Sequence, residues 1–316
     1  MGRCMPCHRR SAAYGVRMPR LKPALLLAAL CLIGAADPST PAQAPLASEE
    51  RASVVFATYR HDDLLWENGR TAHRIYGHAL EAVEPPSGSG IDAWGKAIRA
   101  PFMDRQLRTG DQHADHGEGL DFYNVHGSRG AGGLGIWYDN KLWTSRNFVR
   151  HRILSAGPRV ADFTVDYAPW PVDVVRKVWE TARFTLPTDT NFTRVTSTIS
   201  SDSPAELIVG IGIAKRATGD TTGTFHPDKA RGRFTWWGPG DPGKGTMGVA
   251  VLVDPGAIAG VTEDYDNHLI LVRVKPGRPF VYYIGAAWDR GLDIHDRSGW
   301  QAYVDGQTPS FLPMGR

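Results

Sequence analysis

Residues 160–167 read VADFTVDY, and this stretch decides the fold class. Its side chains alternate strictly between apolar and polar, with Ala161, Phe163, Val165 and Tyr167 on one side and Asp162, Thr164 and Asp166 on the other. An alternation with a period of two gives an extended chain one buried face and one exposed face. The stretch therefore predicts a half-buried β-strand.

Similar runs of β-branched and aromatic residues recur along the chain, separated by Gly, Pro, Asp and Asn. They predict further strands near residues 54–59, 73–76, 148–154, 174–186, 193–200, 207–214, 233–237, 247–253, 268–274 and 280–287. Helical periodicity is weak, and 42–52 and 301–305 are the modest candidates. Many antiparallel strands bury their faces best by stacking, so we expect an all-β, large antiparallel two-sheet supersandwich.

The N-terminal segment differs from the rest and predicts export. A basic stretch (Arg17, Arg20, Lys22) precedes the apolar run ALLLAALCLI at 24–33 and the small residues at 34–36. That order is typical of a secretory signal, and the run is too short to span a bilayer. We expect residues 1–36 to be a signal peptide starting at Met1 or Met18, 37–50 a flexible lead-in, and 51–316 a single β-sandwich domain. The location is then periplasmic or secreted, with no retained membrane span.

The charge and cysteine counts of the mature chain limit the function classes. Residues 1–36 hold six Lys or Arg and no acid, so without them 30 basic residues face 33 acidic ones and the net charge changes from +3 to −3. A mildly acidic chain lacks the basic footprint of a nucleic-acid-binding protein. All three cysteines also lie in this segment, which leaves no disulfide for the mature domain.

The densest polar stretch is HADHGEGLDFY at residues 113–123. In an extended chain His116 and Glu118 lie on one side, where an imidazole and a carboxylate can divide proton transfer between them. Two alternatives stay open: a solvated loop with an incidental ion pair, and a divalent-cation site for Zn, Mn or Ca built from His113, Asp115, His116 and Glu118. No cofactor is required by any diagnostic spacing.

Two earlier segments supply candidate substrate-binding residues. In RHDDLLWENGRTAHRIY at 60–76, Arg74 or Arg70 can pair with a substrate carboxylate through its planar guanidinium, although a hairpin with charges on its outer face is the simpler interpretation. In SGIDAWGK at 89–96, Asp92, Trp94 and Lys96 occupy alternate positions, so the indole can stack on a sugar ring while the charged groups bind hydroxyls, unless Trp94 is core.

The run GSRGAGGLG at 127–135 is rich in glycine but fits no phosphate-binding pattern. We expect a loop that brings the backbone close to a ligand, with Arg129 as the side chain that projects into the site.

Together these motifs resemble a known family. The strings DDLLWEN, RIYG, SGIDAW, HGEGLDFY, SRGAGG and GPR are similar to those of the domain of unknown function 4861, from about Arg60 to Trp300. The resemblance implies a galactose mutarotase-like supersandwich and an association with the degradation of pectin and other uronate polysaccharides. It implies as site residues Asp92, His116, Glu118, Asp121, Tyr123 and Arg129.

We therefore expect a carbohydrate-active enzyme that acts on uronic-acid-containing oligosaccharides by acid/base chemistry. His116, Glu118 and Asp121 are the expected catalytic residues, and the expected substrate-binding residues are Arg74, Asp92, Trp94, Lys96, Tyr123 and Arg129. The sequence leaves lyase, isomerase or mutarotase, and hydrolase chemistry open. The alternative function is a non-catalytic carbohydrate-binding protein.

Overall fold

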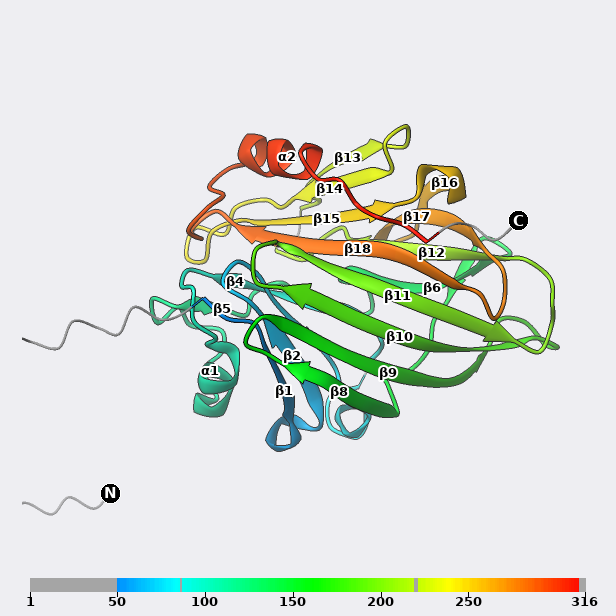
Figure 1. The fold of residues 1–316 in the computed structure, drawn as a ribbon, viewed down its shortest axis with the longest axis horizontal. Coiled ribbons are helices and arrows are strands. Elements are labelled where there is room, and N and C mark those ends of the chain that lie inside the picture. The colour runs from blue at the N-terminus through cyan, green and yellow to red at the C-terminus, as the bar shows by residue number, and fades with distance from the viewer. Residues whose placement is uncertain (1–49, 86, 219–220, 313–316) are drawn as a thin grey trace, which may run out of the picture. The chain divides into compact units, whose positions relative to one another are not determined.

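A computed structural model describes residues 50–85, 87–218 and 221–312 (Figure 1). The predicted signal peptide and lead-in lie outside the described residues, apart from Glu50. The alternating stretch at residues 160–167 forms the first eight residues of strand β9 (Val160–Pro171) and packs its apolar side inward. The remaining elements assemble into three antiparallel sheets.

The largest sheet has eight strands (Figure 1). In spatial order it contains β13 (Thr224–Asp228), β14 (Arg233–Trp237), β15 (Met247–Val253), β18 (Pro279–Trp288), β11 (Phe192–Ser201), β10 (Lys177–Pro187), β9 (Val160–Pro171) and β8 (Arg150–Ala156). Strand β8 forms one edge, is exposed over nearly all its length and begins with Arg150, His151 and Arg152.

Two five-stranded sheets form the second layer. The first contains β1 (Ser53–Ala57), β2 (Asp63–Glu67), β3 (Ala72–Ile75), β4 (Ile91–Lys96) and β5 (Gly119–Leu120). The second contains, in spatial order, β16 (Ile258–Glu263), β17 (Asn267–Val274), β12 (Leu207–Ala214), β6 (Ala131–Tyr138) and β7 (Lys141–Trp143). A single parallel bridge between Ile91 and Gly130 joins them.

One hydrophobic core unites all three sheets. Trp66 of β2 reaches the large sheet, where its ring packs 5.3 Å from those of Phe163 and Phe184. Its Nε1 donates to Thr193 Oγ1 at 2.9 Å. The predicted all-β sandwich is confirmed, with the difference that one of its two layers is divided into two sheets.

Short helices complete the fold. They are α1 (Met103–Thr109), α2 (Arg297–Asp305) and the 3₁₀ turns η1 (Thr58–Arg60), η2 (His78–Ala82) and η3 (Pro255–Ala257). The expected helix at 301–305 forms the second half of α2. The Glu67 carboxylate starts α1, because its Oε1 accepts from the backbone amides of Phe102 and Met103, each at 2.9 Å.

The glycine-rich stretch departs from the expected loop. From Ala131 onward it is strand β6, in the middle of a sheet. Gly130 has φ +61°, and a Cβ there would lie 2.0 Å from the Ile91 carbonyl oxygen. The glycines therefore let the two smaller sheets approach each other, and packing between backbones explains them better than contact with a ligand.

Candidate functional site

The strand pairing of the first five-stranded sheet brings opposite charges together. Arg74 of β3 lies directly opposite Asp92 of β4. The Arg74 guanidinium donates to Asp92 Oδ2 from Nε at 2.9 Å and from Nη2 at 2.7 Å. The same Nη2 donates to Asp121 Oδ2 at 2.9 Å. Arg74, Asp92 and Asp121 come from three separate segments of the sequence, and they form one buried cluster.

Asp63 is the third carboxylate beside this guanidinium. Its Oδ2 lies 3.9 Å from Arg74 Nη1, and its Oδ1 accepts from the Gly77 amide at 2.9 Å. Burial lowers the pKa of Arg74, but Asp121 and Asp92 outweigh it and raise this pKa well above the ordinary value. The guanidinium therefore stays charged while three carboxyl groups compete for it.

Burial also sets the charge of the carboxyl groups. It raises the pKa of Asp92 to about 8, with the neighbouring Asp121 adding to the effect. It raises the pKa of Asp63 to about 6, against the lowering effect of Arg74. Burial and the neighbouring Asp121 thus favour the protonated form of Asp92, which limits the excess of negative charge around Arg74.

A cavity of about 320 Å³ opens beside this cluster. Arg74 and Asp121 form part of its wall, and the remaining lining residues are Arg60, Tyr76, Leu80, Glu84, Pro85, Ser87, Gly88, Gln112, His113, Tyr123, Asn124, Val125 and His126. This volume lies within the range of about 300–1,000 Å³ found for small-molecule sites. The mixture of cations, carboxylates, imidazoles and phenols suits a polar ligand.

The rim of the cavity carries a positioned imidazole. His113 Nδ1 lies 2.9 Å from the backbone oxygen of Asp121, to which it donates. Its Nε2 lies 3.2 Å from the Gln112 side-chain amide. The ring remains 61% exposed, so a ligand that replaces the Gln112 contact can reach Nε2 and exchange a proton with it.

Two guanidinium nitrogens of the cavity wall have unused hydrogen-bonding capacity. Arg60 pairs with Glu84 at 2.9 Å through Nη2. However, Arg60 Nη1 and Arg74 Nη1 are buried atoms that have no hydrogen-bond partner among the described residues. Because buried donors are nearly always satisfied, this pair points to a ligand with acceptor oxygens. The left-handed conformations of His61 and Asp62 (φ 55° and 68°) place local backbone strain next to Arg60.

Trp94 and Lys96 lie on the same face of β4 as Asp92 but do not line the cavity. Trp94 is buried, donates through Nε1 to Asp92 Oδ2 at 3.1 Å and packs 6.0 Å from the Phe102 ring. Lys96 is buried against Glu67 at 2.7 Å. The expected stacking of a sugar on this tryptophan is wrong, because Trp94 is buried in a cluster with Phe102 and with Met103 and Leu107 of α1.

His116 and Glu118 do not share a cleft. His116 Nε2 lies 3.2 Å from Asp111 Oδ2, and Glu118 accepts from Arg105 at 2.5 Å. Neither residue lines the cavity. The left-handed Gly117 (φ +85°) lies between them, so the chain there is not the extended stretch that the pairing required. The spatial condition for this catalytic pair is therefore not met, whereas Asp121 and Tyr123 of the same motif do reach the cavity.

Arg129 lies behind the cavity wall and not in it. The side chain is buried, and its Nη1 donates to Ser89 Oγ at 3.0 Å. Burial lowers its pKa to about 10. The guanidinium is close to Gly88, since a Cβ on that glycine would meet Arg129 Nη2 at 3.4 Å. Arg129 therefore does not project into the site as predicted, and it supports the cavity wall from behind.

The proposed divalent-cation site is not assembled. No group of three or more His, Cys, Asp or Glu side chains in the described part of the chain is close enough to hold a metal ion. His113 and His116 have the partners given above, and Asp115 Oδ1 accepts from the Gly117 amide at 2.8 Å.

Sequence reasoning passed over several residues of this site. Arg60, Tyr76, Gln112 and Asn124 line the cavity and Asp63 lies beside Arg74, yet none of them was singled out. The acidic pair before Trp66 was a usable signal for Asp63, because a carboxylate at the start of a buried strand needs a partner.

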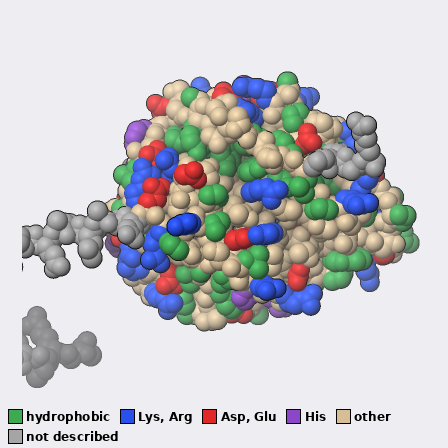
Figure 2. Space-filling model, viewed as in Figure 1, with side chains coloured by type: hydrophobic (Ala, Val, Ile, Leu, Met, Phe, Trp, Pro, Cys, Tyr) green, Lys and Arg blue, Asp and Glu red, His purple; other side chains and the backbone are tan. Residues whose placement is uncertain are grey.

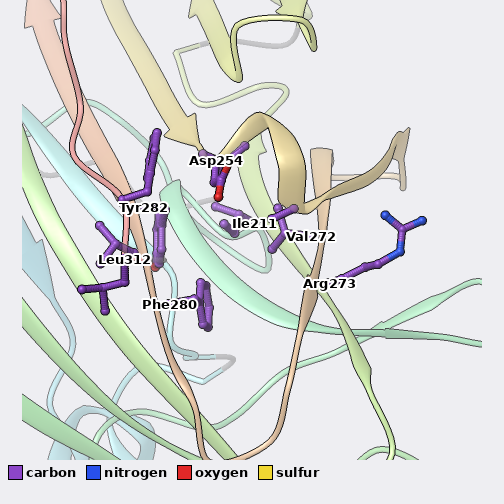
Figure 3. Close-up of a pocket in the computed structure, with 11 residues that line it drawn as sticks. Ile211, Asp254, Val272, Arg273, Phe280, Tyr282 and Leu312 are labelled. Atoms are coloured by element: carbon purple, nitrogen blue, oxygen red, sulfur yellow. The ribbon is translucent and has the colours of Figure 1, made fainter. Parts of the chain in front are cut away.

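A second cavity is apolar and far smaller. It holds about 20 Å³ and lies where residues of β12, β17 and β18 meet the C-terminal segment. Phe280, Tyr282 and Leu312 crowd around it (Figure 3). It has room for about one water molecule and none for a sugar.

Comparison with known proteins places the chain in a family. The model of a domain of unknown function, DUF4861, matches residues 38–311. The chain belongs to this family. One relative in sequence is the uncharacterized protein P7 of Formosa agariphila (strain DSM 15362), which is 29% identical over 265 residues. The match covers 79% of this chain and 65% of that protein, so the chain spans about two thirds of its relative's length.

Among solved structures, this DUF4861 chain is similar to the galactosidase domain of an alpha-galactosidase-sucrose kinase, AgaSK. The TM-score is 0.37 at 9% identity, over 75% of this chain and 42% of the other. A likeness this low supports no conclusion about activity. No helix among the described residues has the length and apolar character needed to cross a membrane.

Replacing Asp92 with Asn tests the protonation of the cluster. The folded pKa of about 8 lies above the ordinary 3.8, so the folded state keeps a proton that the unfolded chain releases. Wild-type stability then falls as pH rises toward 8, by at most about 1.4 kcal/mol per pH unit from this group. Asn cannot ionise, so we expect Asp92→Asn to lose this slope and to be at least as stable as wild type above about pH 8.

Urea unfolding at several pH values between about 6 and 9 measures this difference. Glu180, whose pKa burial raises to about 7, is present in both proteins and cancels. Asp173→Asn is the matched control, because Asp173 lies outside the cluster and hydrogen bonds from the Val175 and Arg176 amides lower its pKa. Parallel stability curves for wild type and Asp92→Asn across this range would show that Asp92 is ionised.

Proposed function

We propose that this protein is an enzyme that acts on uronic-acid-containing oligosaccharides by acid/base chemistry in the cavity beside Arg74. One observation carries the proposal: Arg60 and Arg74 both line this cavity, and Nη1 of each is a buried donor without a hydrogen-bond partner among the described residues. Guanidinium groups match carboxylate oxygens in charge and geometry. A sugar carboxylate would accept hydrogen bonds from both donors. A neutral sugar would satisfy them less well, because it carries no negative charge.

The two cations also favour one kind of chemistry. A carboxylate held by guanidinium groups acidifies the neighbouring C–H bond, because the enolate that forms on proton loss is stabilised electrostatically. We assign Asp121 as the base that takes this proton. The electron pair then forms a carbon–carbon double bond as the bond to the glycosidic oxygen on the next carbon breaks. His113 delivers a proton to the leaving oxygen.

The remaining wall fits a sugar ring. Tyr76 lies beneath Arg74, with the guanidinium carbon 5.0 Å from the ring centroid. Tyr123 is buried at the floor, and Gln112 and Asn124 bring amide groups suited to hydroxyls. The cavity thus offers apolar rings and hydrogen-bonding groups around the proposed carboxylate position.

Incubation with saturated and unsaturated pectic oligosaccharides tests the reaction. Elimination creates an unsaturated uronate that absorbs in the ultraviolet, and NMR in deuterium oxide identifies which carbon loses its hydrogen. We expect new absorbance, together with loss of the hydrogen beside the carboxylate and no deuterium on that carbon in the product. Deuterium exchange without new absorbance would indicate isomerase chemistry, and cleavage without new absorbance would indicate hydrolysis. Binding with neither reaction would make the protein a non-catalytic carbohydrate-binding protein.

Arg60→Gln tests the carboxylate position without disturbing the buried cluster. Loss of a charge-assisted hydrogen bond costs about 1.5–3 kcal/mol, so we expect the Kd for an oligouronide to rise roughly ten- to hundredfold. Calorimetry gives this value. An oligosaccharide whose carboxyl groups have been reduced to alcohols is the control, and its weaker binding should not change between the two proteins. Equal loss for both ligands would overturn the assignment.

A further inference from the structure

A groove on the outer face of the large sheet has the features of a second ligand site. Four side chains from neighbouring strands form a row across it, because Thr185 pairs with Arg194, Arg194 with Tyr283, and Tyr283 with Leu252 in the strand register. The groove holds about 330 Å³, as much as the first cavity, and shares no lining residue with it.

The C-terminal segment 307–310 forms one wall of the groove. It is fixed in place by Tyr283, whose hydroxyl donates to the Ser310 carbonyl at 2.9 Å and accepts from its amide at 3.2 Å. Arg233 holds the preceding turn by donating to the carbonyl oxygens of Asp305 and Gln307. The wall is therefore built before any ligand arrives.

Arg194 is the unusual residue of this groove. It is half-buried, and its Nη1 donates to Thr196 Oγ1 at 2.6 Å, but it forms no ion pair with any described residue. Two other arginines on this sheet have carboxylate partners: Arg183 pairs with Asp162 at 2.5 Å, and Arg150 with Asp166 at 3.2 Å. Figure 2 looks onto this face and shows Lys and Arg side chains spread over it, with Asp or Glu next to some of them.

The surroundings of Arg194 suit a ring with a negative charge. Tyr283 and Phe192 present aromatic surface, while Thr185 and Thr190 add hydroxyl groups. Apolar rings that contact C–H faces, next to a cation and hydroxyls, are the usual elements of recognition for an acidic sugar. A neutral apolar ligand would leave the guanidinium without an anion, so charge complementarity favours the acidic one.

We propose that this groove is a second binding site for an acidic carbohydrate, with the carboxylate at Arg194 and a sugar ring against Tyr283. The class of ligand rests on the proposed function, whereas the site itself does not. A second site on another face lets the protein hold a long chain while the cavity beside Arg74 acts on one of its units.

Calorimetric titration with an oligouronide too short to reach both sites tests the inference. We expect two binding sites per wild-type chain and one per chain in Arg194→Gln, with turnover of the same short substrate unchanged. Arg194→Lys keeps the charge and should restore part of the binding. The matched control is Lys177→Gln, an exposed cation on the outward side of β10, which should leave both sites intact.

The outcomes separate this inference from the proposed function. Turnover with one binding site per chain, unaffected by Arg194→Gln, would overturn the groove site and leave the enzyme. Binding that Arg194→Gln abolishes, in a protein without turnover, would support the groove and overturn the enzyme. Equal binding of an acidic peptide, such as a short poly-glutamate, would show that the groove recognises charge alone and would overturn its assignment to carbohydrate.

Discussion

Asp121→Asn is expected to reduce turnover of an oligouronide by roughly 10²–10⁴-fold, the usual contribution of a positioned general base. The side chain lines the cavity and uses Oδ2 to accept from Arg74. Its Oδ1 accepts no hydrogen bond from the described residues, so this atom can take the substrate proton. An amide keeps the shape but loses the basicity. Initial rates under saturating substrate measure the effect.

Two neighbouring variants make this result specific. Asp115→Asn changes an exposed carboxylate in the same loop and should leave the rate unchanged. Glu118→Gln breaks the ion pair with Arg105 and should also retain turnover. If Glu118→Gln abolished the reaction and Asp121→Asn did not, Glu118 and not Asp121 would be the base. This result would restore the role that the sequence predicted for Glu118.

Arg74→Met is expected to lower the free energy of unfolding by about 3–5 kcal/mol, because it leaves buried carboxylates without their counter-charge. The side chain is 6% exposed and lies within 3.9 Å of three carboxyl groups, those of Asp63, Asp92 and Asp121. Methionine fills similar volume, so the loss reports charge and hydrogen bonding more than packing. Urea unfolding near neutral pH gives the value.

Arg60→Gln is the matched control for stability. Its ion pair joins a half-buried guanidinium to a largely exposed carboxylate, and such pairs contribute about 0–1 kcal/mol. Combining Arg74→Met with Asp92→Asn should recover little of the lost stability near neutral pH, because burial already favours the neutral form of Asp92. A loss as small as that of Arg60→Gln would mean that the cluster is protonated throughout and needs no cation.

Much of the fold was predictable because strand alternation is a local property. Strands β12, β14 and β15 begin and end at the expected residues. Strand β6 was missed, since its glycines carry no side-chain pattern and their role appears only when another backbone lies against them. The division of one layer into two sheets also depends on pairings between distant segments, which periodicity does not encode.

The sequence predicted several residues of the candidate site, but it did not predict the contacts between them. Arg74, Asp92 and Asp121 were each singled out as substrate-binding or catalytic residues, yet their mutual contacts depend on the β3–β4 register. The register follows from the buried faces of both strands and not from the charges themselves. The spacing of His116 and Glu118 predicted that their side chains lie on one side of an extended chain. Gly117 turns the chain between them, so His116 contacts Asp111 and Glu118 contacts Arg105.

The edge strand β8 has a consequence for how the protein behaves at high concentration. Its backbone offers unpaired amide and carbonyl groups to any neighbouring molecule, and an unguarded edge of this kind promotes fibril-like association. Arg152 on that edge forms no ion pair with any described residue, so it places a like charge there in every molecule and two copies repel each other where they would otherwise join. Neutralising Arg152 should make the protein precipitate from solutions in which the natural sequence stays dispersed.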